Sequence, residues 1–413
     1  MARLVRPLPL RIALCNITDV AEQGRVIVIG AGIVGAAIAR SLVRSGTEVV
    51  VLDRGPSAGG TSSGGEGNLL VSDKGPGPEL ELMQRSIQLW SEIGPQLRDE
   101  LPAGFPGLEL EHKGGLVVAT TEAGAVGLKQ FAVQQRTAGV VAEEVGADRV
   151  RELEPDLTRD FVTAVLYPQD AQVQPVVATE SLLASARQKG AQVRQGVEVL
   201  GPVLSKGRLT GVRTSDGVVN GDAVVVAAGP WSGQVAAALG APVPVKPRRG
   251  TVLVTTRMPQ RVWHKVYDAD YVGAVGSGAA DLQVSSVVES TAAGTVLIGS
   301  SREQRGFDDR IEARVLAALA AKALLLFPFL KDVAVMRAYG GFRPFMPDHL
   351  PLIGPDPRLA GLWHATGHEG AGIGLSLGTA EVLSQHLLGA APAAENPFRV
   401  DRPSLRPHLE DAA

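Results

Sequence analysis

Residues 26–54 read VIVIGAGIVGAAIARSLVRSGTEVVVLDR, and their apolar pattern predicts a strand, a helix and a second strand in succession. Gly30, Gly32 and Gly35 follow the first strand in the G-x-G-x-x-G spacing of a dinucleotide-binding turn. These glycines permit a tight turn, close approach of a pyrophosphate to the backbone, and close packing of helix against strand. Asp53 ends the second strand, where a carboxylate can bind the ribose hydroxyls of an adenosine. The stretch therefore predicts a Rossmann-type unit that binds a dinucleotide.

Composition narrows the class of protein. The chain has 413 residues, of which 45% are hydrophobic, and a formal net charge of -3. This length predicts two domains or one large α/β body, and the charge provides no basic excess for binding nucleic acid. No apolar run approaches the roughly 18 residues that a membrane-spanning helix needs. Cys15 is the only cysteine, which excludes disulfides, cysteine-ligated zinc and an iron–sulfur cluster within these residues. We therefore expect no metal site, no nucleic-acid partner and no transmembrane segment.

The two ends of the chain look separate from this core. Residues 1–24 are basic and carry a short apolar stretch, but no signal-peptide core or cleavage site follows. We interpret them as a disordered extension, and a targeting role stays open. We interpret residues 391–413 as a C-terminal tail.

A glycine- and serine-rich loop follows Asp53, where a nicotinamide dehydrogenase would continue with regular βαβ units. This loop, residues 55–70, reads GPSAGGTSSGGEGNLL and is too polar for a strand. The hydroxyls of Thr61, Ser62 and Ser63, with backbone N–H groups between glycines, suit the phosphates and ring edge of an extended cofactor. A flexible surface loop is the alternative reading.

Two later segments predict further parts of the same nucleotide domain. Residues 222–232 read DAVVVAAGPWS, a buried strand that enters a glycine turn, after a helix pattern at 180–189 and a strand at 197–200. Residues 362–376 read LWHATGHEGAGIGLS and open a helix, whose N-terminus can stabilise negative charge on a reduced flavin. A nucleotide domain divided in this way is typical of flavoproteins.

With these motifs the sequence resembles the D-amino acid oxidase superfamily of FAD-dependent oxidoreductases, over about residues 25–390. The motifs that carry the resemblance are VIVIGAGIVG with Asp53, TSSGGEGN, VVVAAGPWS, GGFRPFMPDHLPLIGP and GHEGAGIG. Three other segments are most similar to the subgroup of D-hydroxyproline dehydrogenase, opine oxidase and hydrogen cyanide synthase flavoprotein subunits. These segments are EGNLLVSDKGPGPELEL (66–82), LYPQDAQVQP (166–175) and TVLIGSSREQRGFD (295–308).

The resemblance implies an α/β fold with two discontinuous domains. The expected division is a Rossmann-type FAD-binding domain with a parallel sheet (25–75, 170–240 and 335–390) and an α+β substrate domain with a mainly antiparallel sheet (76–169 and 241–334). The residue pattern agrees, because 251–255 and 295–299 predict short strands, and 310–327 predict a helix that Pro328 ends.

The resemblance also implies an activity. It is the oxidation of a D-amino acid, or of a cyclic or secondary amino acid of the proline, opine, sarcosine or glycine type. The hydride passes to N5 of a non-covalently bound FAD and leaves an imine. The subgroup implies iron–sulfur partner subunits and a cytoplasmic protein, either free or peripheral at the inner membrane through its electron acceptor. Two alternatives stay open: an electron-transfer FAD subunit of a heteromeric dehydrogenase, and a flavin hydroxylase or nicotinamide-linked reductase.

Arg343 is the candidate anchor for the substrate carboxylate. In glycine oxidase and D-amino acid oxidase relatives the arginine of the matching G-x-R-P motif has this role, and a guanidinium can hold both oxygens. A structural ion pair with Asp348 is the alternative. Glycine oxidase has an arginine after the histidine of the last motif, whereas this chain continues His368-Glu369-Gly370. The second carboxylate contact is thus missing or comes from elsewhere.

His368 and Tyr267 are further catalytic candidates, each with core packing as the alternative. His368 and Glu369 form a polar pair that could act on the substrate amine or on flavin N1. Tyr267 belongs to WHKVYDADYVG, whose tyrosines could close over the substrate. Arg248 and Arg249 are read as surface or interdomain charges, and a pocket role for Arg302 is left open.

The cofactor is expected to lie against all the glycine-rich segments at once. The expected cofactor-binding residues are Gly30, Gly32, Ile33, Val34, Gly35, Asp53, Arg54, Thr61, Ser62, Ser63, Gly67, Asn68, Val197, Ala228, Gly229, Trp231, Gly341, Arg343, Gly367, His368, Glu369, Gly370, Gly372 and Ile373.

Overall fold

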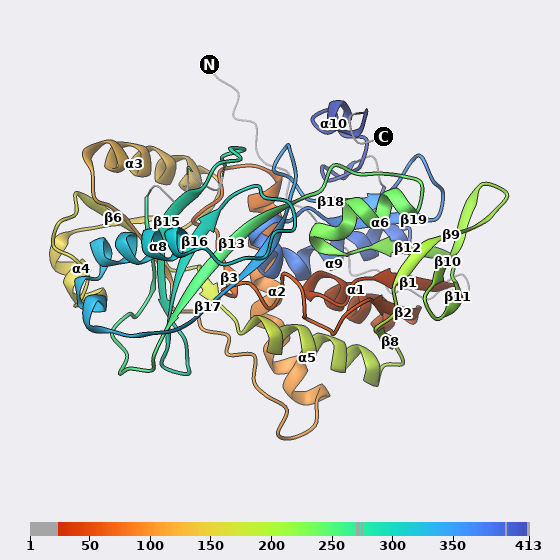
Figure 1. Cartoon of the computed structure of the whole chain (residues 1–413), viewed down its shortest axis with the longest axis horizontal. Coiled ribbons are helices and arrows are strands. Elements are labelled where there is room, and N and C mark those ends of the chain that lie inside the picture. Colours follow the sequence, from red (N-terminus) through yellow and green to blue (C-terminus); the bar gives the residue numbers. More distant parts are fainter. Residues whose placement is uncertain (1–23, 270–272, 274–275, 393–394, 411–413) are drawn as a thin grey trace, which may run out of the picture.

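The computed structural model describes residues 24–269, 273, 276–392 and 395–410, which form two halves around two different sheets. In Figure 1 the half that contains α1, α9 and β1 lies on the right, and the half with α3, α4 and α8 lies on the left. Apart from Gly24, the N-terminal extension expected at residues 1–24 lies outside the described residues.

A six-stranded sheet forms the first half. Five of its strands are parallel. The three neighbouring strands β1, β2 and β12 carry runs of buried apolar residues, as expected where both faces of a sheet are covered, whereas the edge strand β8 is polar and mostly exposed. Ile27 of β1 pairs with Val50 of β2 on one side and Val224 of β12 on the other. Across the sheet the strands are β18 (Leu352–Pro355, antiparallel), β19 (Leu362–Thr366), β12 (Ala223–Val226), β1 (Arg25–Ile29), β2 (Glu48–Asp53) and β8 (Gln192–Gln195).

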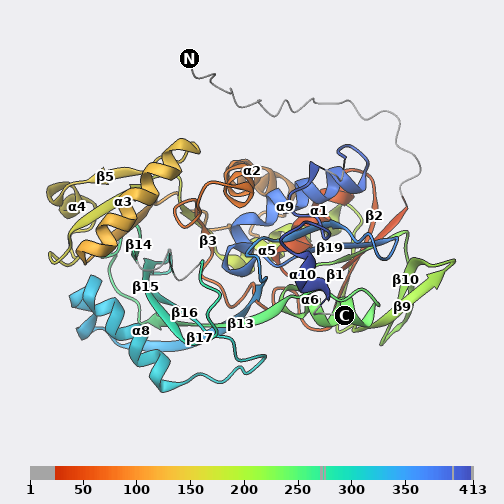
Figure 2. The same cartoon turned by 90° about the horizontal axis from the view of Figure 1, so that it is seen from above.

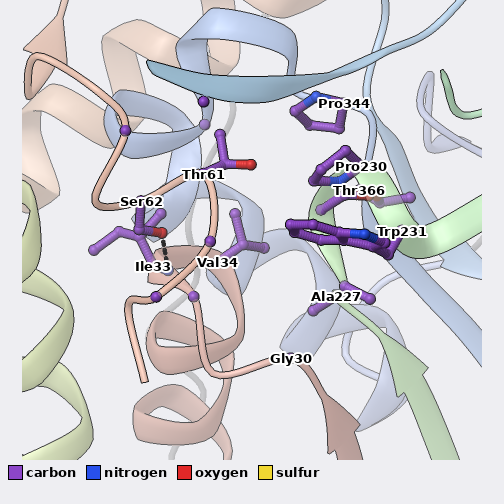
Figure 3. A pocket seen from close by; sticks show the side chains of 18 of the residues that line it. Gly30, Ile33, Val34, Thr61, Ser62, Ala227, Pro230, Trp231, Pro344 and Thr366 are labelled. Carbon is purple, nitrogen blue, oxygen red and sulfur yellow. Dashed lines mark hydrogen bonds between the residues drawn. The ribbon is translucent and has the colours of Figure 1, made fainter. Parts of the chain in front are cut away.

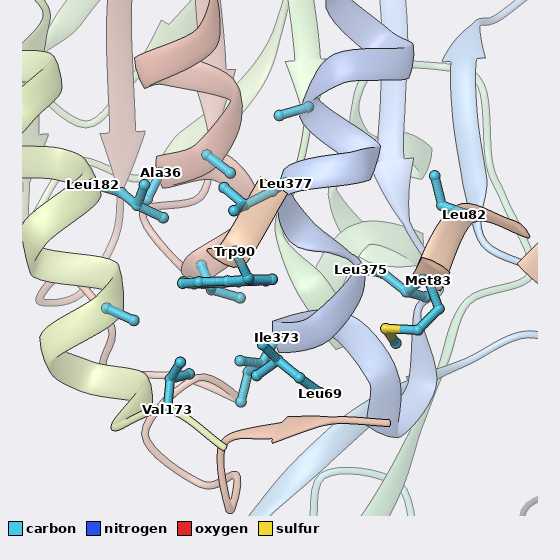
Figure 4. Packing of buried hydrophobic residues seen from close by; sticks show 14 of the residues in the cluster. Ala36, Leu69, Leu82, Met83, Trp90, Val173, Leu182, Ile373, Leu375 and Leu377 are labelled. Atoms are coloured by element: carbon cyan, nitrogen blue, oxygen red, sulfur yellow. The ribbon is translucent and has the colours of Figure 1, made fainter. Parts of the chain in front are cut away.

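Four helices cover this sheet. The first, α1 (Ile33–Arg44), packs against α5 (Pro175–Gln188) and α9 (Gly372–Leu387), and α2 (Pro78–Glu100) packs against α9. Trp90 of α2 is fully buried, and its indole N–H donates a hydrogen bond of 3.1 Å to the Gly374 carbonyl in the first turn of α9. Figure 4 shows Trp90 between side chains of α9 and α5. This packing fixes the beginning of α9, which borders the cavity described below.

An eight-stranded, mainly antiparallel sheet forms the second half. Leu319 and Phe327, in and after α8 (Ala313–Leu326), are fully buried in its core. The helices α3 (Glu122–Thr137) and α4 (Ala147–Leu153) lie at its far end. Across the sheet the strands are β17 (Val335–Phe345), β13 (Lys246–Thr255), β16 (Val296–Arg302), β15 (Gln283–Ser290), β14 (Lys265–Asp268), β4 (Gly115–Ala119), β6 (Thr163–Tyr167) and β5 (Glu143–Val145).

The smaller elements join or extend the two halves. Strand β3 pairs with β7, and β9, β10 and β11 form an antiparallel sheet of their own. Their bounds, with those of the short helices, are β3 (Asn68–Leu69), β7 (Ala171–Gln172), β9 (Val199–Ser205), β10 (Arg208–Thr214), β11 (Gly217–Asn220), η1 (Gly229–Trp231), α6 (Ser232–Ala238), η2 (Pro328–Asp332), η3 (Glu369–Ala371) and α10 (Arg406–Glu410).

The structure differs from the expected division in two places. The FAD-binding part was expected to resume at residue 335, but β17 pairs with β13 along the eight-stranded sheet. The strand expected at 197–200 is offset, because β8 ends at Gln195 and β9 begins at Val199. The polar residues and the glycine around position 196 do not show in the sequence where one strand ends and the next begins.

The described part of the C-terminal tail packs onto the protein. Phe398, Val400 and Leu405 are buried, and Arg402 forms an ion pair with Asp348, with 2.7 Å between Nε and Oδ2. In the view of Figure 2, α10 lies over α6 on the first half of the molecule. Within the residues that the structure describes, no helix combines the length and the apolar character needed to span a bilayer.

Candidate functional site

A cavity of about 420 Å³ lies where the six-stranded sheet meets the edge of the eight-stranded sheet. Its walls come from the turn after β1, the 54–68 loop, η1, strands β13 and β17, and the residues before α9. Figure 3 shows Trp231 and Pro230 on one side of the cavity and Thr61, Val34 and Ile33 on the other. A cavity of this size at the carboxyl ends of parallel strands is where α/β proteins bind ligands.

The turn between β1 and α1 leaves no space for side chains. Gly30 has a φ of 116°, and a Cβ there would overlap the Ala227 carbonyl oxygen. A Cβ on Gly35 would overlap the Gly30 carbonyl oxygen, so helix and strand pack in contact. The first turn of α1 carries no acidic residue, and the Ile33 N–H donates to the Ser62 hydroxyl at 2.9 Å. This helix N-terminus therefore borders the cavity with the positive end of its dipole, which suits a pyrophosphate.

Asp53 is held rigidly at the end of β2. Its Oδ2 accepts the Ala31 N–H at 2.7 Å, and its Oδ1 accepts the Gly55 N–H at 2.8 Å. Nearby, the Arg54 guanidinium lies 4.8 Å from the centre of the Trp231 ring. Val197 follows the neighbouring β8, and its N–H donates to the Asp53 carbonyl at 2.9 Å. These residues line the cavity together and suit the adenosine end of a dinucleotide.

The 54–68 loop lies between the two halves, so it is not a free surface loop. The Thr61 hydroxyl donates to the Phe342 carbonyl of β17 at 2.6 Å, and the Tyr339 hydroxyl donates to the Gly65 carbonyl at 3.3 Å. A Cβ on Gly64 would approach Gly341 Cα to 2.9 Å, which explains the glycines at this crossing. The loop thus continues the cavity from the phosphate region toward the eight-stranded sheet.

Arg343 lies on the cavity wall at the edge of the eight-stranded sheet. Its guanidinium covers Gly250 of the neighbouring strand so closely that a Cβ there would overlap it. Its Nη1 donates to the Ser301 carbonyl at 2.8 Å. The Asp348 carboxylate pairs with Arg402, so the alternative ion pair of Arg343 with Asp348 is not formed. A cation is thus positioned at the end of the cavity opposite Asp53.

His368 lies under the cavity, at the start of α9. It is 3% exposed, and its Nε2 is 2.9 Å from the Thr379 hydroxyl. Burial lowers the pKa of His368 to about 3, so the ring is neutral at ordinary pH. The ring lines the cavity and hydrogen bonds Thr379 of α9, so it packs against that helix, and its catalytic role stays a prediction.

Glu369 has a different partner from the one that the sequence suggested. Its Oε1 lies 2.8 Å from His349 Nδ1, and its Oε2 lies 3.6 Å from Arg248 Nη1. Both Glu369 and His349 have left-handed backbone, with φ values of 45° and 56°. The Glu369 carboxylate raises the pKa of His349. His349 lies within the motif GGFRPFMPDHLPLIGP, but nothing in that motif singled it out as a partner of Glu369.

Tyr267 does not line the cavity. It belongs to β14, in the interior of the eight-stranded sheet, and is fully buried in the core. Its hydroxyl donates to Asp170 Oδ2 at 3.0 Å and contacts the Ser72 hydroxyl. Burial raises the pKa of Asp170 to about 6. A buried hydroxyl needs a partner, and Asp170 provides it, so Tyr267 is a core residue. Of the other aromatics in this segment, Trp263 is exposed, and Tyr271 lies outside the described residues.

Most of the expected cofactor-binding residues line the cavity, and four do not: Gly35, Ser63, Gly67 and Gly367. Gly67 and Gly367 are glycines because close packing leaves no space for a side chain. A Cβ on Gly67 would overlap the Val173 carbonyl, and one on Gly367 would overlap the Met346 side chain. The sequence reasoning also left out cavity residues. Four lie within its own motifs, and two lie on β13: Glu66, Pro230, Pro344 and Thr366, and Gly250 and Val252.

Three arginines expected at the surface or left open are buried. Arg248, Arg249 and Arg302 are 0%, 4% and 4% exposed. Burial lowers the pKa of Arg248, which contacts Phe345 with its guanidinium 5.4 Å from the ring centre. Arg249 donates to the Asp309 carbonyl at 2.7 Å. Arg248 and Arg249 were read as surface or interdomain charges, and only the surface reading is wrong. The first half covers this edge of the sheet, and Arg248 Nη1 lies 3.6 Å from Glu369 Oε2 of that half.

The fold and the cavity define a two-domain nucleotide-dependent oxidoreductase, with a Rossmann-type sheet at one end of the site and a substrate sheet at the other. The model of the FAD-dependent oxidoreductase family DAO matches residues 25–386, and the chain belongs to this family. It is therefore an FAD-dependent enzyme of the kind that oxidises amino acids.

Similar proteins agree with this assignment. Glycine oxidase from Pseudomonas putida is 30% identical over 374 residues, which cover 89% of this chain and 95% of that protein. The hydrogen cyanide synthase subunit HcnC from Pseudomonas aeruginosa is 31% identical over 240 residues, or 58% of this chain and 54% of that protein. The crystal structure of glycine oxidase from Geobacillus kaustophilus superposes with a TM-score of 0.82 at 25% identity, covering 92% of this chain and 99% of that one.

Proposed function

We propose that this enzyme oxidises a small amino or imino acid whose carboxylate is held by Arg343. The observation that carries the proposal is the position of Arg343 on the cavity wall, over Gly250 and next to Gly370, at the end opposite Asp53. A planar guanidinium binds a carboxylate through two parallel hydrogen bonds and so fixes both position and orientation. With the carboxylate fixed, the α carbon is confined to the space beside the cofactor end of the cavity.

The cavity fits FAD in an extended conformation. Asp53, Arg54 and Val197 suit the adenosine, and Gly32, Ile33, Val34 and Ser62 suit the pyrophosphate at the helix N-terminus. Gly341, Gly370, Gly372 and Ile373 line the end that is left for the flavin ring. When bound, FAD accepts the hydride that leaves the α carbon of the substrate. The residues before α9 direct a helix N-terminus toward this end, where negative charge develops.

We further propose that the electrons leave through a partner. One similar protein, HcnC, is by name a subunit of a synthase. The single cysteine of this chain cannot ligate a cluster, so iron–sulfur centres would belong to partner subunits. We expect the enzyme to lie in the cytoplasm and to contact the inner membrane only through such a partner.

An anaerobic visible spectrum of the purified protein tests the activity. The titrants are cis-4-hydroxy-D-proline, D-proline, sarcosine, glycine, D-alanine and an opine. Bleaching of the flavin bands by one of them establishes the reductive half-reaction and the substrate class. Readmitted air then separates an oxidase, whose colour returns rapidly, from an enzyme that needs another acceptor. A yellow protein that no member of the panel bleaches contradicts the proposed substrates.

A further inference from the structure

A buried carboxylate on the cavity wall has an oxygen without a partner. Glu66, in the loop between β2 and β3, is 8% exposed and lines the same cavity as Arg343. Its Oε2 accepts a hydrogen bond of 3.4 Å from the Asn68 amide. Its Oε1 has no hydrogen-bond partner among the described residues. Burying a carboxylate oxygen without a partner is costly, so this atom points to a ligand that donates a hydrogen bond.

Glu66 and Arg343 face the cavity over the same strand, β16. A Cβ on Gly299 would overlap Glu66 Oε1, whereas Arg343 Nη1 binds the carbonyl of Ser301, two residues farther along. Two residues of a strand span about 7 Å. That spacing suits an α-amino acid, whose carboxylate and nitrogen would each need a hydrogen bond of about 2.8 Å to the wall.

The cations near Glu66 are already engaged with other groups. Lys265 lies 2.8 Å from Glu289 Oε2 in a fully buried pair, and Lys113 pairs with Glu111 at 2.7 Å. Burial raises the pKa of both Glu289 and Tyr339, and the nearby Glu66 carboxylate raises each further by a smaller amount. The surroundings of Glu66 thus contain other acidic groups, which makes a cationic ligand at this position more favourable.

Another carboxylate near Arg343 is less suited to this task. Glu369 also lines the cavity, but its two oxygens are already occupied by His349 and Arg248. Asp53 is at the opposite end and accepts two backbone N–H groups. Glu198, beside Val197, is exposed to solvent. Among the described residues, Glu66 is therefore the buried acidic residue of the cavity wall that has an oxygen without a partner, and that oxygen lies against Gly299 of β16.

We propose that Glu66 binds the amino group of the substrate and is the anionic counterpart of Arg343. This inference rests on the proposed function and extends it to substrate selection. A ligand with a basic nitrogen next to its carboxylate contacts both groups. A ligand with carbon in place of that nitrogen contacts Arg343 alone and leaves the Glu66 charge buried without a partner. The site therefore selects amino acids over plain carboxylic acids.

The test compares matched ligand pairs on the FAD-loaded enzyme. The pairs are D-proline with cyclopentanecarboxylate, and sarcosine with butanoate, in which CH₂ replaces NH. For the amines, the apparent affinity is measured from the concentration dependence of anaerobic flavin bleaching, and for the carbon analogues from the shift of the flavin bands. FAD content and melting temperature are measured alongside. In Glu66→Gln we expect the amine to bind about 10- to 100-fold more weakly. The carbon analogue should bind equally well or more tightly, since no charge remains to be buried.

Three variants separate the competing explanations. Arg343→Lys should weaken both members of each pair, because both carry the carboxylate. Glu369→Gln should leave the ratio between the two affinities unchanged. Glu381→Gln, which removes a charge on α9 outside the cavity where Glu381 pairs with Arg85, is the matched control.

Each other outcome overturns a stated part of the proposal. If Glu66→Gln weakens both members equally, Glu66 does not bind the amine. If Glu66→Gln loses FAD but keeps the ratio between the affinities for the amine and for its carbon analogue, the free oxygen of Glu66 binds the cofactor instead. If Glu369→Gln removes the preference for amines, that role belongs to Glu369. If the wild-type enzyme binds neither member of either pair, the proposed function fails for these substrates, and this inference fails with it.

Discussion

The proposed binding of the substrate carboxylate by Arg343 is tested most directly by the variant Arg343→Lys. Lysine keeps the charge but replaces a planar fork by a single ammonium, and it cannot reach the Ser301 carbonyl and a substrate in the same geometry. We expect Arg343→Lys to raise the apparent dissociation constant for the reducing amino acid at least tenfold, with FAD content unchanged. Anaerobic flavin titration measures both quantities. Unchanged affinity would show that the carboxylate binds elsewhere.

The low pKa of His368 makes the free energy of unfolding depend on pH. Its folded-state pKa of about 3 lies below the ordinary value of 6.5, so the unfolded chain binds a proton there that the folded protein does not. The free energy of unfolding should therefore fall as the pH decreases from about 6.5 toward 3. In His368→Gln, which can still hydrogen bond Thr379, this decrease should be shallower by one proton. Urea denaturation at several pH values measures it, and His112→Gln, at an exposed position, should behave as the wild type.

At the scale of the elements, the βα turn gives a prediction about packing. A Cβ on Gly35 would overlap the Gly30 carbonyl oxygen, so α1 would have to move away from β1. We expect Gly35→Ala to cost about 1–3 kcal/mol of stability and to weaken FAD binding. The matched control is Gly127→Ala in α3, where an added Cβ meets nothing within 4 Å. That change should stabilise the protein by about 0.5–1 kcal/mol, because alanine favours a helix more than glycine does. Thermal denaturation compares the two, and equal effects would contradict the packing explanation.

Elements with a local signal could be predicted from the sequence, and contacts between distant segments could not. The glycine spacing of residues 30–35 and the acid at 53 define their own geometry, and the structure has both as expected. Tyr267 was misread because a tyrosine near charged residues looks the same in the sequence whether it faces a cavity or Asp170. Arg248 was read as either a surface or an interdomain charge, and the sequence could not decide because the covering half is remote along the chain.

The missed residues have the same physical explanation. His349 contacts Glu369 because both residues adopt a left-handed backbone conformation that neither residue type favours. Residue propensities therefore could not predict this contact from the sequence. The strand β17 was assigned to the wrong half because its motif, GGFRPF, contributes to the cavity while its backbone pairs with β13. Sequence motifs identify what lines a site, and backbone pairing decides which sheet carries it.

At the scale of the whole molecule, the C-terminal tail fixes a loop of the site. Arg402 is 3% exposed, pairs with Asp348 and donates to the carbonyls of Leu350, Pro351 and Phe398. Asp348 adjoins His349, so this pair holds the segment that contacts Glu369. We expect Arg402→Ala to cost about 3–5 kcal/mol, since it leaves a buried carboxylate without its partner.

Denaturation monitored by flavin release and by circular dichroism measures that cost. The control is Arg406→Ala, on the exposed α10, which should change stability by less than about 0.5 kcal/mol. A tail that only covered the surface would give the same small change for both variants.

The order of the strands has a consequence for how the enzyme is made. The central strand β1 is synthesised about two hundred residues before its neighbour β12, and the next strand, β19, comes later still. The cavity closes only when Gly372 and Ile373 are in place, more than three hundred residues after Gly30. A nascent polypeptide on the ribosome therefore has no complete binding site until residue 373 has been synthesised. The cofactor is captured only after that point.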